Sequence, residues 1–241
     1  MIASERRMLI LRMLQDKGVI NLHEAVSTLG SSEATVRRDF EKLEREGKLQ
    51  RVQGGAMLQD WQDSIQPSMH EKRNVNLTQK RMVSAHAAEL VLDGQCVFLD
   101  CGTSIVPLWE ILMKRPVKIV SNSSLLLSVK GEQRAELFLL GGTYSANNNM
   151  TYGTLTKHAL QEFYFDHAFI GCFGFSAAEG KAYTLELDSA EVKQTAMKKS
   201  RQCHLLADDS KLERQGFYAF AELSDFQSVI YEKKIERMVI K

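Results

Sequence analysis

The sequence lacks the features that would place the chain in or across a membrane. No apolar run approaches the ~20 residues that a membrane span needs. No signal peptide is recognisable, because charged residues interrupt the first apolar stretch at Glu5, Arg6, Arg7 and Arg12. These two absences lead us to expect a cytoplasmic protein with no membrane partner. The net charge is only +1, so any affinity for DNA must come from a local patch.

Cysteine and histidine are scarce and unclustered. The four cysteines form no CxxC pair and lie mostly in apolar segments, which predicts buried free thiols in a reducing compartment: Cys96, Cys101, Cys172 and Cys203. The six histidines show no metal-ligand spacing, so we expect neither a metal site nor a cofactor. No repeat or low-complexity tract interrupts the 241 residues, which are enough for two domains.

Residues 31–56 carry the clearest pattern that is present. Ser32 is expected to cap a helix through its side-chain oxygen, with Ser31 as a second candidate. Gly47 is expected to end that helix as a left-handed residue. Between them, apolar residues at helical spacing predict one buried face: Val36, Phe40 and Leu43.

A polar and cationic edge lies on the opposite side of this predicted helix. Residues 48–53 then alternate like a short strand, and Gly54–Gly55 allows a tight turn. A capped basic helix followed by a basic hairpin is typical of a winged helix-turn-helix, whose helix fits the major groove while the hairpin follows the DNA backbone. The pattern predicts these DNA contacts: Ser32, Thr35, Arg37, Arg38, Lys48 and Arg51.

The preceding residues fit two further helices. The first is expected after a cap at Ser4, closed by Gly18, with Met8, Leu11 and Leu14 inward. The second is expected to open with a capping box at Asn21 and Glu24 and to end at Gly30. Its inward residues are Leu22, Ala25, Val26 and Leu29. We assign residues 1–58 to this domain; the alternative is a small surface domain whose arginines are simply solvated.

Residues 59–78 lose periodicity and contain Pro67, so we read them as a connector. In residues 79–241 apolar strands alternate with amphipathic helices, which implies a mostly parallel sheet with helices on both faces. Thr78 is expected to cap the first helix, with Met82, Val83, Ala87, Leu90 and Val91 inward. Strands are expected at 96–100, 117–120, 136–140, 165–171 and 204–207, and helices at 105–112, from Ser123 and at 187–199.

Polar residues follow four of these strands. Ligands of such sheets bind beyond the carboxyl ends of the strands. Glycine lets the backbone approach an anion, hydroxyls and helix-start N–H groups donate to it, lysine adds positive charge, and aspartate accepts from sugar hydroxyls. We expect one shared site for a small phosphorylated sugar or polyol, built from Lys80, Asp100, Gly102, Thr103, Ser104, Ser121, Asn122, Gly141, Gly142, Asp208 and Lys211.

Several spaced motifs carry a family resemblance. The first part has Arg6, Ile10 and Leu14, then Ser32-x-x-Thr35-Val36-Arg37-Arg38-Asp39-Phe40 and Gly47-x-Leu49-x-Arg51-Val52-x-Gly54-Gly55-Ala56. The second part has Lys80, Asp100-x-Gly102-Thr103, Asn122, Gly141-Gly142, Gly153, Gly171, Glu191-x-Lys193 and Asp208-x-Ser210-Lys211. With these motifs the sequence resembles the DeoR family of bacterial regulators of sugar metabolism.

The resemblance implies a sensor domain similar in fold to ribose-5-phosphate isomerase and a phosphorylated sugar as effector. It implies a repressor of a carbohydrate-utilisation operon that acts as a dimer or tetramer on double-stranded DNA. Ser31 and Gln53 depart from the family pattern, which has valine and histidine there, and this affects operator contacts.

Two other functions compete with this one. The first is a sugar-phosphate isomerase fused to a DNA-binding domain, with Asp100, Glu191 or Asp208 as base and Lys211 polarising a carbonyl. No carboxylate stands isolated in an apolar segment as a tuned base would, so we expect no enzyme activity. The second is an adaptor that uses its helix-turn-helix for protein contacts. Sequence-selective, salt-dependent DNA binding separates both from a regulator.

Overall fold

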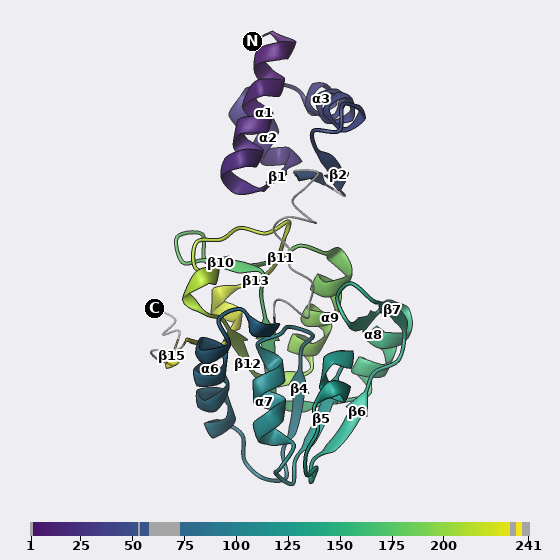
Figure 1. The fold of residues 1–241 in the computed structure, drawn as a ribbon, viewed down its shortest axis with the longest axis vertical. Coiled ribbons are helices and arrows are strands. Elements are labelled where there is room, and N and C mark those ends of the chain that lie inside the picture. The colour runs from purple at the N-terminus through teal and green to yellow at the C-terminus, as the bar shows by residue number, and fades with distance from the viewer. Residues whose placement is uncertain (1, 53, 58–72, 232–234, 238–241) are drawn as a thin grey trace. The chain divides into compact units, whose positions relative to one another are not determined.

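The computed structural model describes residues 2–52, 54–57, 73–231 and 235–237. Contacts divide the chain into two compact units, Met1–Pro67 and Ser68–Lys241. Gln53 and residues 59–72 of the predicted connector lie outside the described residues. Figure 1 shows the elements of each unit, which we describe one at a time.

The first unit is a winged helix-turn-helix. It has three helices and a three-stranded antiparallel sheet with strand order β1-β3-β2, whose first strand lies between the first two helices. Its elements are α1 (Ala3–Lys17), β1 (Val19–Asn21), α2 (Leu22–Leu29), α3 (Glu33–Arg45), β2 (Gln50–Val52) and β3 (Gly55–Met57). The three helices and the sheet enclose one core of Ile10, Leu14, Ile20, Leu22, Ala25, Leu29, Val36, Phe40, Leu43, Leu49 and Ala56. Burial of this apolar face is what holds α3 in place.

Local sequence signals set most of the boundaries in this unit. Ser32 is the N-cap of α3 and accepts the Thr35 N–H at 3.3 Å. Gly47 adopts a left-handed φ of 69° just past the helix. Asn21 caps α2 by accepting the Glu24 N–H at 2.7 Å, so the capping prediction there is confirmed.

Two predictions for α1 are wrong. Ser4 lies inside the helix, because the N-cap is Ile2, whose N–H donates to Glu5 Oε2 at 3.2 Å. Met8 is 70% exposed, because residues spaced three apart drift by about 60° around a helix at each step. Leu14 is buried as predicted and Leu11 is half-buried, while Ile10 is a further buried position of α1.

Gly55 allows β1 and β3 to lie unusually close together. It pairs with Asn21 across the antiparallel sheet. A Cβ at this position would overlap the Ile20 carbonyl oxygen and lie 2.9 Å from the Asn21 Cα. Only glycine leaves room for this approach, which joins the wing to the helical part of the unit.

The second unit is an α/β domain built on a seven-stranded sheet. The strand order is β15-β14-β12-β9-β4-β5-β6, in which the six strands from β14 to β6 are parallel and β15 is antiparallel at the edge. The strands of this sheet are β4 (Cys96–Leu99), β5 (Lys118–Ser121), β6 (Glu136–Leu139), β9 (Phe165–Gly171), β12 (Ser200–Leu206), β14 (Ser228–Ile230) and β15 (Ile235–Arg237). The predicted mostly parallel sheet is therefore confirmed.

Helices cover both faces of this sheet (Figure 1). One apolar cluster packs α6 (Leu77–Glu89) and α7 (Ile105–Leu112) on one face through Val83, Leu108 and Trp109. The other packs α8 (Thr154–Gln161) and α9 (Leu187–Lys198) on the opposite face through Leu160 and Val192. Short helical turns lie at η1 (Ser124–Ser128), η2 (Asp209–Lys211) and η3 (Leu223–Asp225).

Two small sheets were not predicted from the sequence. One is the three-stranded antiparallel sheet of β10 (Gly174–Ser176), β11 (Lys181–Thr184) and β13 (Tyr218–Glu222). The other is the hairpin of β7 (Thr143–Ser145) and β8 (Met150–Tyr152). The turn of this hairpin contains three consecutive asparagines, residues 147–149, for which the sequence suggests no motif. Asn149 has a left-handed φ of 49°.

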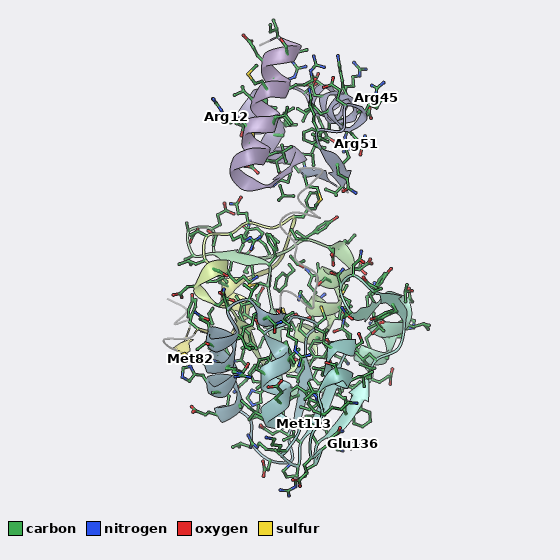
Figure 2. All side chains as sticks on the ribbon, in the orientation of Figure 1. Arg12, Arg45, Arg51, Met82, Met113 and Glu136 are labelled. Carbon is green, nitrogen blue, oxygen red and sulfur yellow. The ribbon has the colours of Figure 1, made fainter. Side chains whose placement is uncertain are left out.

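Two predictions for α6 are also wrong. The N-cap is Asn76, in a left-handed conformation with φ of 53°, so Thr78 lies in the first helical turn. Met82 points outward and is 45% exposed (Figure 2), whereas the next residue, Val83, is buried. Of the other predicted inward positions, Ala87 and Val91 are buried and Leu90 is half-buried against the same cluster.

All four cysteines are free thiols; Cys101 and Cys203 are buried, and Cys96 and Cys172 are half-buried. Burial raises the pKa of Cys101 to about 12 and that of Cys172 to about 11. Within the described ranges, no cluster of three or more metal-ligating side chains occurs. No described helix is long and apolar enough to cross a membrane.

Candidate functional site

The first candidate site is the exposed edge of α3 in the winged helix-turn-helix. Ser32 Oγ and Thr35 Oγ1 lie 2.8 Å apart at its first turn. Arg37, one turn further on, forms an exposed ion pair with Glu33 at 2.6 Å. Arg38 is exposed and has no ion pair or hydrogen bond among the described residues. The N-terminal part of α3 therefore presents hydroxyls and guanidinium groups together.

The wing cations are already engaged with carboxylates. Lys48 pairs with Glu46 at 2.8 Å, and the Arg51 guanidinium pairs with Glu44 at 2.8 Å and Glu41 at 3.0 Å. All of these groups are at least a third exposed, where ion pairs exchange readily with other partners. The sequence pattern predicts phosphate contacts for these cations but does not reveal the ion pairs of Arg51. The carboxylates of those pairs, Glu41 and Glu44, come from α3.

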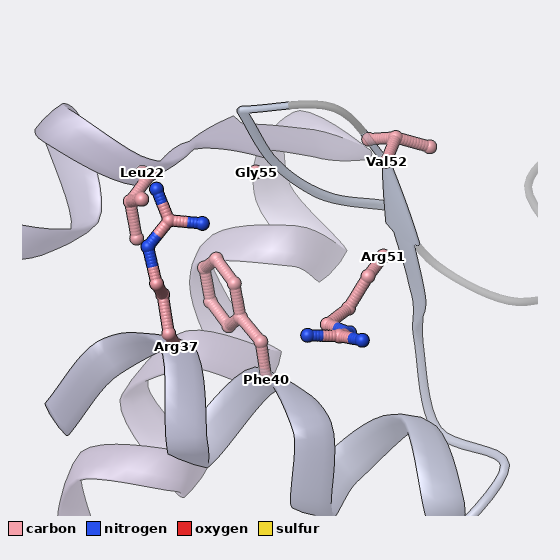
Figure 3. A pocket seen from close by; sticks show the side chains of 6 residues that line it. All are labelled: Leu22, Arg37, Phe40, Arg51, Val52 and Gly55. Carbon is pink, nitrogen blue, oxygen red and sulfur yellow. The ribbon is translucent and has the colours of Figure 1, made fainter. Parts of the chain in front are cut away.

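A pocket of about 260 Å³ separates α3 from the wing. Figure 3 shows Arg37 and Arg51 on either side of Phe40 in this pocket, with Leu22, Val52 and Gly55 around it. Two of the three arginines predicted to contact DNA, Arg37 and Arg51, therefore line one pocket although they come from different elements.

A buried ion pair fixes α3 against α1. Asp39 on α3 is buried and pairs with Arg6 on α1, while Arg7 lies 4.0 Å from the same carboxylate. Removing one partner of a buried pair costs about 3–5 kcal/mol because the other charge is left uncompensated. Both residues belong to the N-terminal motif, and their ion pair connects α3 to α1.

The second candidate site is the edge of the seven-stranded sheet where its six parallel strands end. Because β4, β5, β6, β9 and β12 are parallel neighbours, their carboxyl ends share one edge. Asp100 follows β4, Asn122 follows β5, Gly141 follows β6 and Asp208 follows β12. The sheet order thus brings the four predicted loops to the same side of the domain.

Asp100 lies at the centre of this edge and is almost fully buried. Its Oδ2 accepts from the Gly171 N–H at 3.0 Å and pairs with the buried Lys193 of α9. Burial disfavours the charged form of Lys193, but the Asp100 carboxylate outweighs it and the pKa of Lys193 is raised. Asp100 Oδ1 is buried and has no hydrogen-bond partner among the described residues.

Two further buried polar atoms lie at the end of β5. Asn122 donates from Nδ2 to the Thr151 carbonyl at 2.9 Å, and Ser121 Oγ accepts the Ser123 N–H at 3.0 Å. Asn122 Oδ1 and Ser123 Oγ have no hydrogen-bond partner within the described part of the chain. Buried polar atoms without partners are costly, so these atoms make this edge a candidate binding site.

The glycines of the predicted loops have different roles. Gly142 has φ of 143°, and a Cβ there would overlap Thr156 Oγ1 and lie 2.6 Å from the Tyr152 carbonyl oxygen. It is therefore needed for packing of the β7–β8 hairpin, whereas a Cβ on Gly141 would meet nothing within 4 Å. Gly102 approaches Gly171, to whose Cα a Cβ would lie at 3.9 Å.

Charged groups of both signs gather near the end of β9. Lys193, Lys211, Asp100 and Asp208 all act electrostatically on Cys172, the residue that follows this strand. Asp208 caps η2 by accepting the Ser210 N–H at 3.0 Å and also accepts from Asn76 at 3.3 Å. Lys211 is half-buried.

The remaining predicted residues lie around the start of α7 and on α6. Thr103 and Ser104 are half-buried, and their hydroxyls have no hydrogen bond among the described residues. Lys80 is buried, with 4% exposure, which rules out a solvated lysine at that position.

The sequence-based selection missed Lys193, Gly171 and Asn76 as site residues. Lys193 and Gly171 belong to the family motifs, but the motifs do not show that both residues contact Asp100. Asp100 and Lys193 are 93 residues apart in sequence. Asn76 carried no motif signal, because its contact with Asp208 spans 132 residues.

The winged helix-turn-helix and the α/β domain with a polar strand edge together define a DNA-binding regulator with a sensor domain. Family models identify both: a DeoR-like helix-turn-helix domain matches residues 6–62, and the DeoR C terminal sensor domain matches residues 75–233. The chain belongs to the DeoR family of transcriptional regulators. It is a regulator of this family and not an enzyme.

Curated relatives match along nearly the whole chain. The "Uncharacterized HTH-type transcriptional regulator FruR" of Bacillus subtilis is 30% identical over 250 residues, covering 100% of this chain and 98% of the relative. The "Lactose phosphotransferase system repressor" of Streptococcus mutans is 29% identical, covering 94% of this chain and 90% of the relative.

Solved structures are similar in fold alone. The beta subunit of eIF2B from Chaetomium thermophilum has a TM-score of 0.50 at 8% identity, covering 67% of this chain and 50% of that chain. Ribose 5-phosphate isomerase A from Methanocaldococcus jannaschii has a TM-score of 0.42 at 17% identity, covering 58% of this chain and 56% of that chain. The chain thus spans about half the length of these solved proteins.

Proposed function

We propose that this regulator represses a carbohydrate-utilisation operon and is controlled by a phosphorylated sugar bound at the sensor-sheet edge. The observation that carries the proposal is the set of buried polar atoms without partners at Asp100, Asn122 and Ser123. Two of these atoms are acceptors for sugar hydroxyls, and the third is a hydroxyl that donates or accepts. The hydroxyl groups of a polyol can pair with each of these kinds of atom.

The phosphate of the effector is assigned to the loop that precedes α7. Gly102 lets the backbone approach an anion, and the half-buried hydroxyls of Thr103 and Ser104 supply donors. Lys80 and Lys211 supply the positive charge. The remaining assigned ligand residues are Ser121, Gly141, Gly142 and Asp208.

Contacts to operator DNA are assigned to α3 and the wing. Arg37 and Arg38, with Ser32 and Thr35, face the major groove, while Lys48 and Arg51 contact phosphates. The exposed ion pairs of these cations exchange for phosphate on binding, as weak surface pairs do. Relatives include a lactose phosphotransferase system repressor, which supports repression over activation.

The organisation of the protein follows from this assignment. Residues 1–58 form the DNA-binding domain, residues 59–78 form the connector between the two domains, and residues 79–241 form the domain that senses the effector. Symmetric operators favour a homo-oligomer, a dimer or tetramer, and a regulator of chromosomal operons acts in the cytoplasm.

Two measurements test the proposal. Selection from a randomised duplex pool with the purified protein should enrich a defined sequence, whose binding weakens steeply with salt. A thermal-shift screen of sugar phosphates against their unphosphorylated parents should find a stabilising phosphorylated sugar that also changes affinity for the selected duplex. A protein stabilised equally by a sugar and its phosphate, or whose DNA affinity no sugar phosphate changes, would contradict it.

A further inference from the structure

The wing strand β2 is attached to the recognition helix by one arginine. The backbone N–H of Arg51 donates to Glu44 Oε1 at 2.9 Å, and its Nε donates to Glu44 Oε2 at 2.8 Å. Its Nη1 donates to Glu41 Oε1 at 3.0 Å. Figure 3 shows the Arg51 guanidinium reaching from the wing toward α3. Two carboxylates spaced three residues apart on α3 thus hold both the backbone and the side chain of one wing residue.

These carboxylates are in an unfavourable place for a protein that binds DNA. Arg51 lines the pocket between α3 and the wing together with Arg37, on the face assigned to DNA. Negative side chains near this face repel phosphate groups, so electrostatics alone predicts that Glu41 and Glu44 weaken DNA binding. The hydrogen bonds from the Arg51 backbone N–H and then from its guanidinium lower the pKa of Glu44 and so favour its charged form.

The geometry points to a positive role that offsets this repulsion. A guanidinium has five N–H donors, and no hydrogen bond from Arg51 Nη2 occurs among the described residues. We propose that Glu41 and Glu44 are positioning residues, which hold Arg51 and the wing strand so that the remaining guanidinium donors face a DNA phosphate. This inference rests on the proposed contact between the wing and DNA.

The proposed role concerns geometry more than stability of the fold. Arg51 is 42% exposed, and the two glutamates are 38% and 48% exposed. Single exposed ion pairs contribute little to folding, so their loss should leave the domain folded. Loss of the two hydrogen bonds to Glu44 instead frees Arg51 to sample other rotamers. Binding of DNA to the wing must then order the Arg51 side chain, which costs binding free energy.

The test uses the sign of the change in DNA affinity. The probe is a fluorescent duplex enriched from a randomised pool by the unmodified protein, and the full chain is used throughout. Glu44→Ala and Glu46→Ala each remove one carboxylate near the end of α3. Glu46 pairs only with the side chains of Lys48 and Arg7 among the described residues, so it serves as a matched control. Thermal unfolding of each variant verifies that it is folded.

We expect Glu44→Ala to weaken binding to the probe by roughly three- to tenfold, although it removes a negative charge, and Glu46→Ala to leave it unchanged or tighter. Arg51→Ala should also weaken binding, with a lower salt slope. The double variant Glu44→Ala/Arg51→Ala should bind no more weakly than Arg51→Ala, because Glu44 acts through Arg51.

Three results would overturn the inference. If Glu44→Ala binds the probe as tightly as the unmodified protein, or more tightly, the glutamate is only repulsive. If the effects of Glu44→Ala and Arg51→Ala add in the double variant, Glu44 acts independently of Arg51. If Arg51→Ala alone changes neither affinity nor salt slope, the proposed wing contact with DNA fails as well, which separates the two failures.

Discussion

Arg37 and Arg38 are neighbours in sequence with different surroundings. Arg37 is paired with Glu33, whereas Arg38 has no ion pair among the described residues. Changing either to alanine should weaken binding to the selected duplex by about 1–3 kcal/mol if a base contact is lost. If the lost contact is to phosphate, the salt slope should fall by about one instead.

Fluorescence anisotropy over a range of salt concentrations measures both quantities. Arg134→Ala, which removes an exposed arginine from the sensor domain, is the control and should leave operator affinity unchanged. Binding of the effector should persist in all three variants. Unchanged affinity and salt slope in both Arg37→Ala and Arg38→Ala would remove this part of α3 from the interface.

Thr103 offers a test of the effector site at a single side chain. Thr103→Asp places a carboxylate where the phosphate is assigned, with little change in size, so it should repel the phosphorylated ligand. The variant should fold and bind DNA but no longer respond to the sugar phosphate. Calorimetry with the phosphorylated sugar and its parent, on both proteins, checks this. Full affinity of the variant for the phosphorylated sugar would take this loop out of the site.

Serine and threonine residues predict the start of a helix correctly at some positions of this sequence and wrongly at others. Ser32 was predicted correctly, because its helix begins directly after it with an apolar face at clear spacing. Ser4 and Thr78 carried the same type of side chain, yet their helices begin at Ala3 and Leu77. A cap can form with a backbone conformation alone, as at the left-handed Asn76, and such a cap has no required hydroxyl.

At the scale of elements, the wing depends on the close approach of two strands. Gly55→Ala should push β1 and β3 apart, because the added methyl group meets backbone atoms of Ile20 and Asn21 that cannot move alone. We expect a larger loss of unfolding free energy than for Gly30→Ala. Gly30 also has a positive φ, of 57°, but open space around it, so its cost is only the conformational strain of about 1–2 kcal/mol.

Chemical denaturation followed by circular dichroism compares the two variants. DNA binding should be lost at a lower denaturant concentration in Gly55→Ala. Equal stability of the two variants would mean that the sheet adapts to the added methyl group without moving the wing.

Three neighbouring strands of the sensor sheet share a buried hydrogen-bonded row. His167 Nδ1 on β9 lies 3.0 Å from His204 Nε2 on β12, whose Nδ1 lies 2.8 Å from Ser228 Oγ on β14. Burial, and then the neighbouring His167, lower the pKa of His204 from 6.5 to about 4. Burial also lowers the pKa of His167, against an opposing effect of Asp166.

Acid should therefore destabilise the sensor domain. Between pH 6.5 and 4 the unfolded chain binds a proton at His204 that the folded chain does not, so unfolding free energy falls as pH falls through this window. Between pH 7 and pH 5 we expect a loss of roughly 2 kcal/mol from this group. Urea unfolding at both pH values measures it.

The contribution of the buried row can be isolated by substitution. His204→Gln should reduce the difference in stability between the two pH values, whereas His158→Gln, at an exposed position, should leave it intact. An unchanged difference in His204→Gln would place the acid sensitivity elsewhere.

The same scale shows why part of the sensor fold was predictable. A strand such as β4 is a continuous apolar run, which a sequence displays directly. The small sheet of β10, β11 and β13 has strands of three to five residues, too short for a periodic signal. Lys193 was hidden for a different reason: a lysine inside a helix looks solvated until Asp100 is found beside it.

At the scale of the whole molecule, the two units have separate cores. Coupling between them is therefore measured as the change in affinity for DNA that the bound effector causes. If the effector changes affinity for the selected duplex by some factor, the duplex must change affinity for the effector by the same factor. Titrating effector with and without duplex, and duplex with and without effector, gives both ratios. Unequal ratios would require an additional linked process, such as a change in oligomeric state.

The order of the chain has a consequence for how the protein comes into being. Every described helix and strand of the DNA-binding unit finds its partners before residue 58, whereas the sensor sheet needs β14, which begins at Ser228, beside β12. Synthesis at about 5–20 residues per second takes roughly ten seconds or more to cover that interval. A nascent chain thus has every residue of the DNA-binding unit well before it has those of the sensor domain, so the part that binds DNA is able to fold before the part that would regulate it.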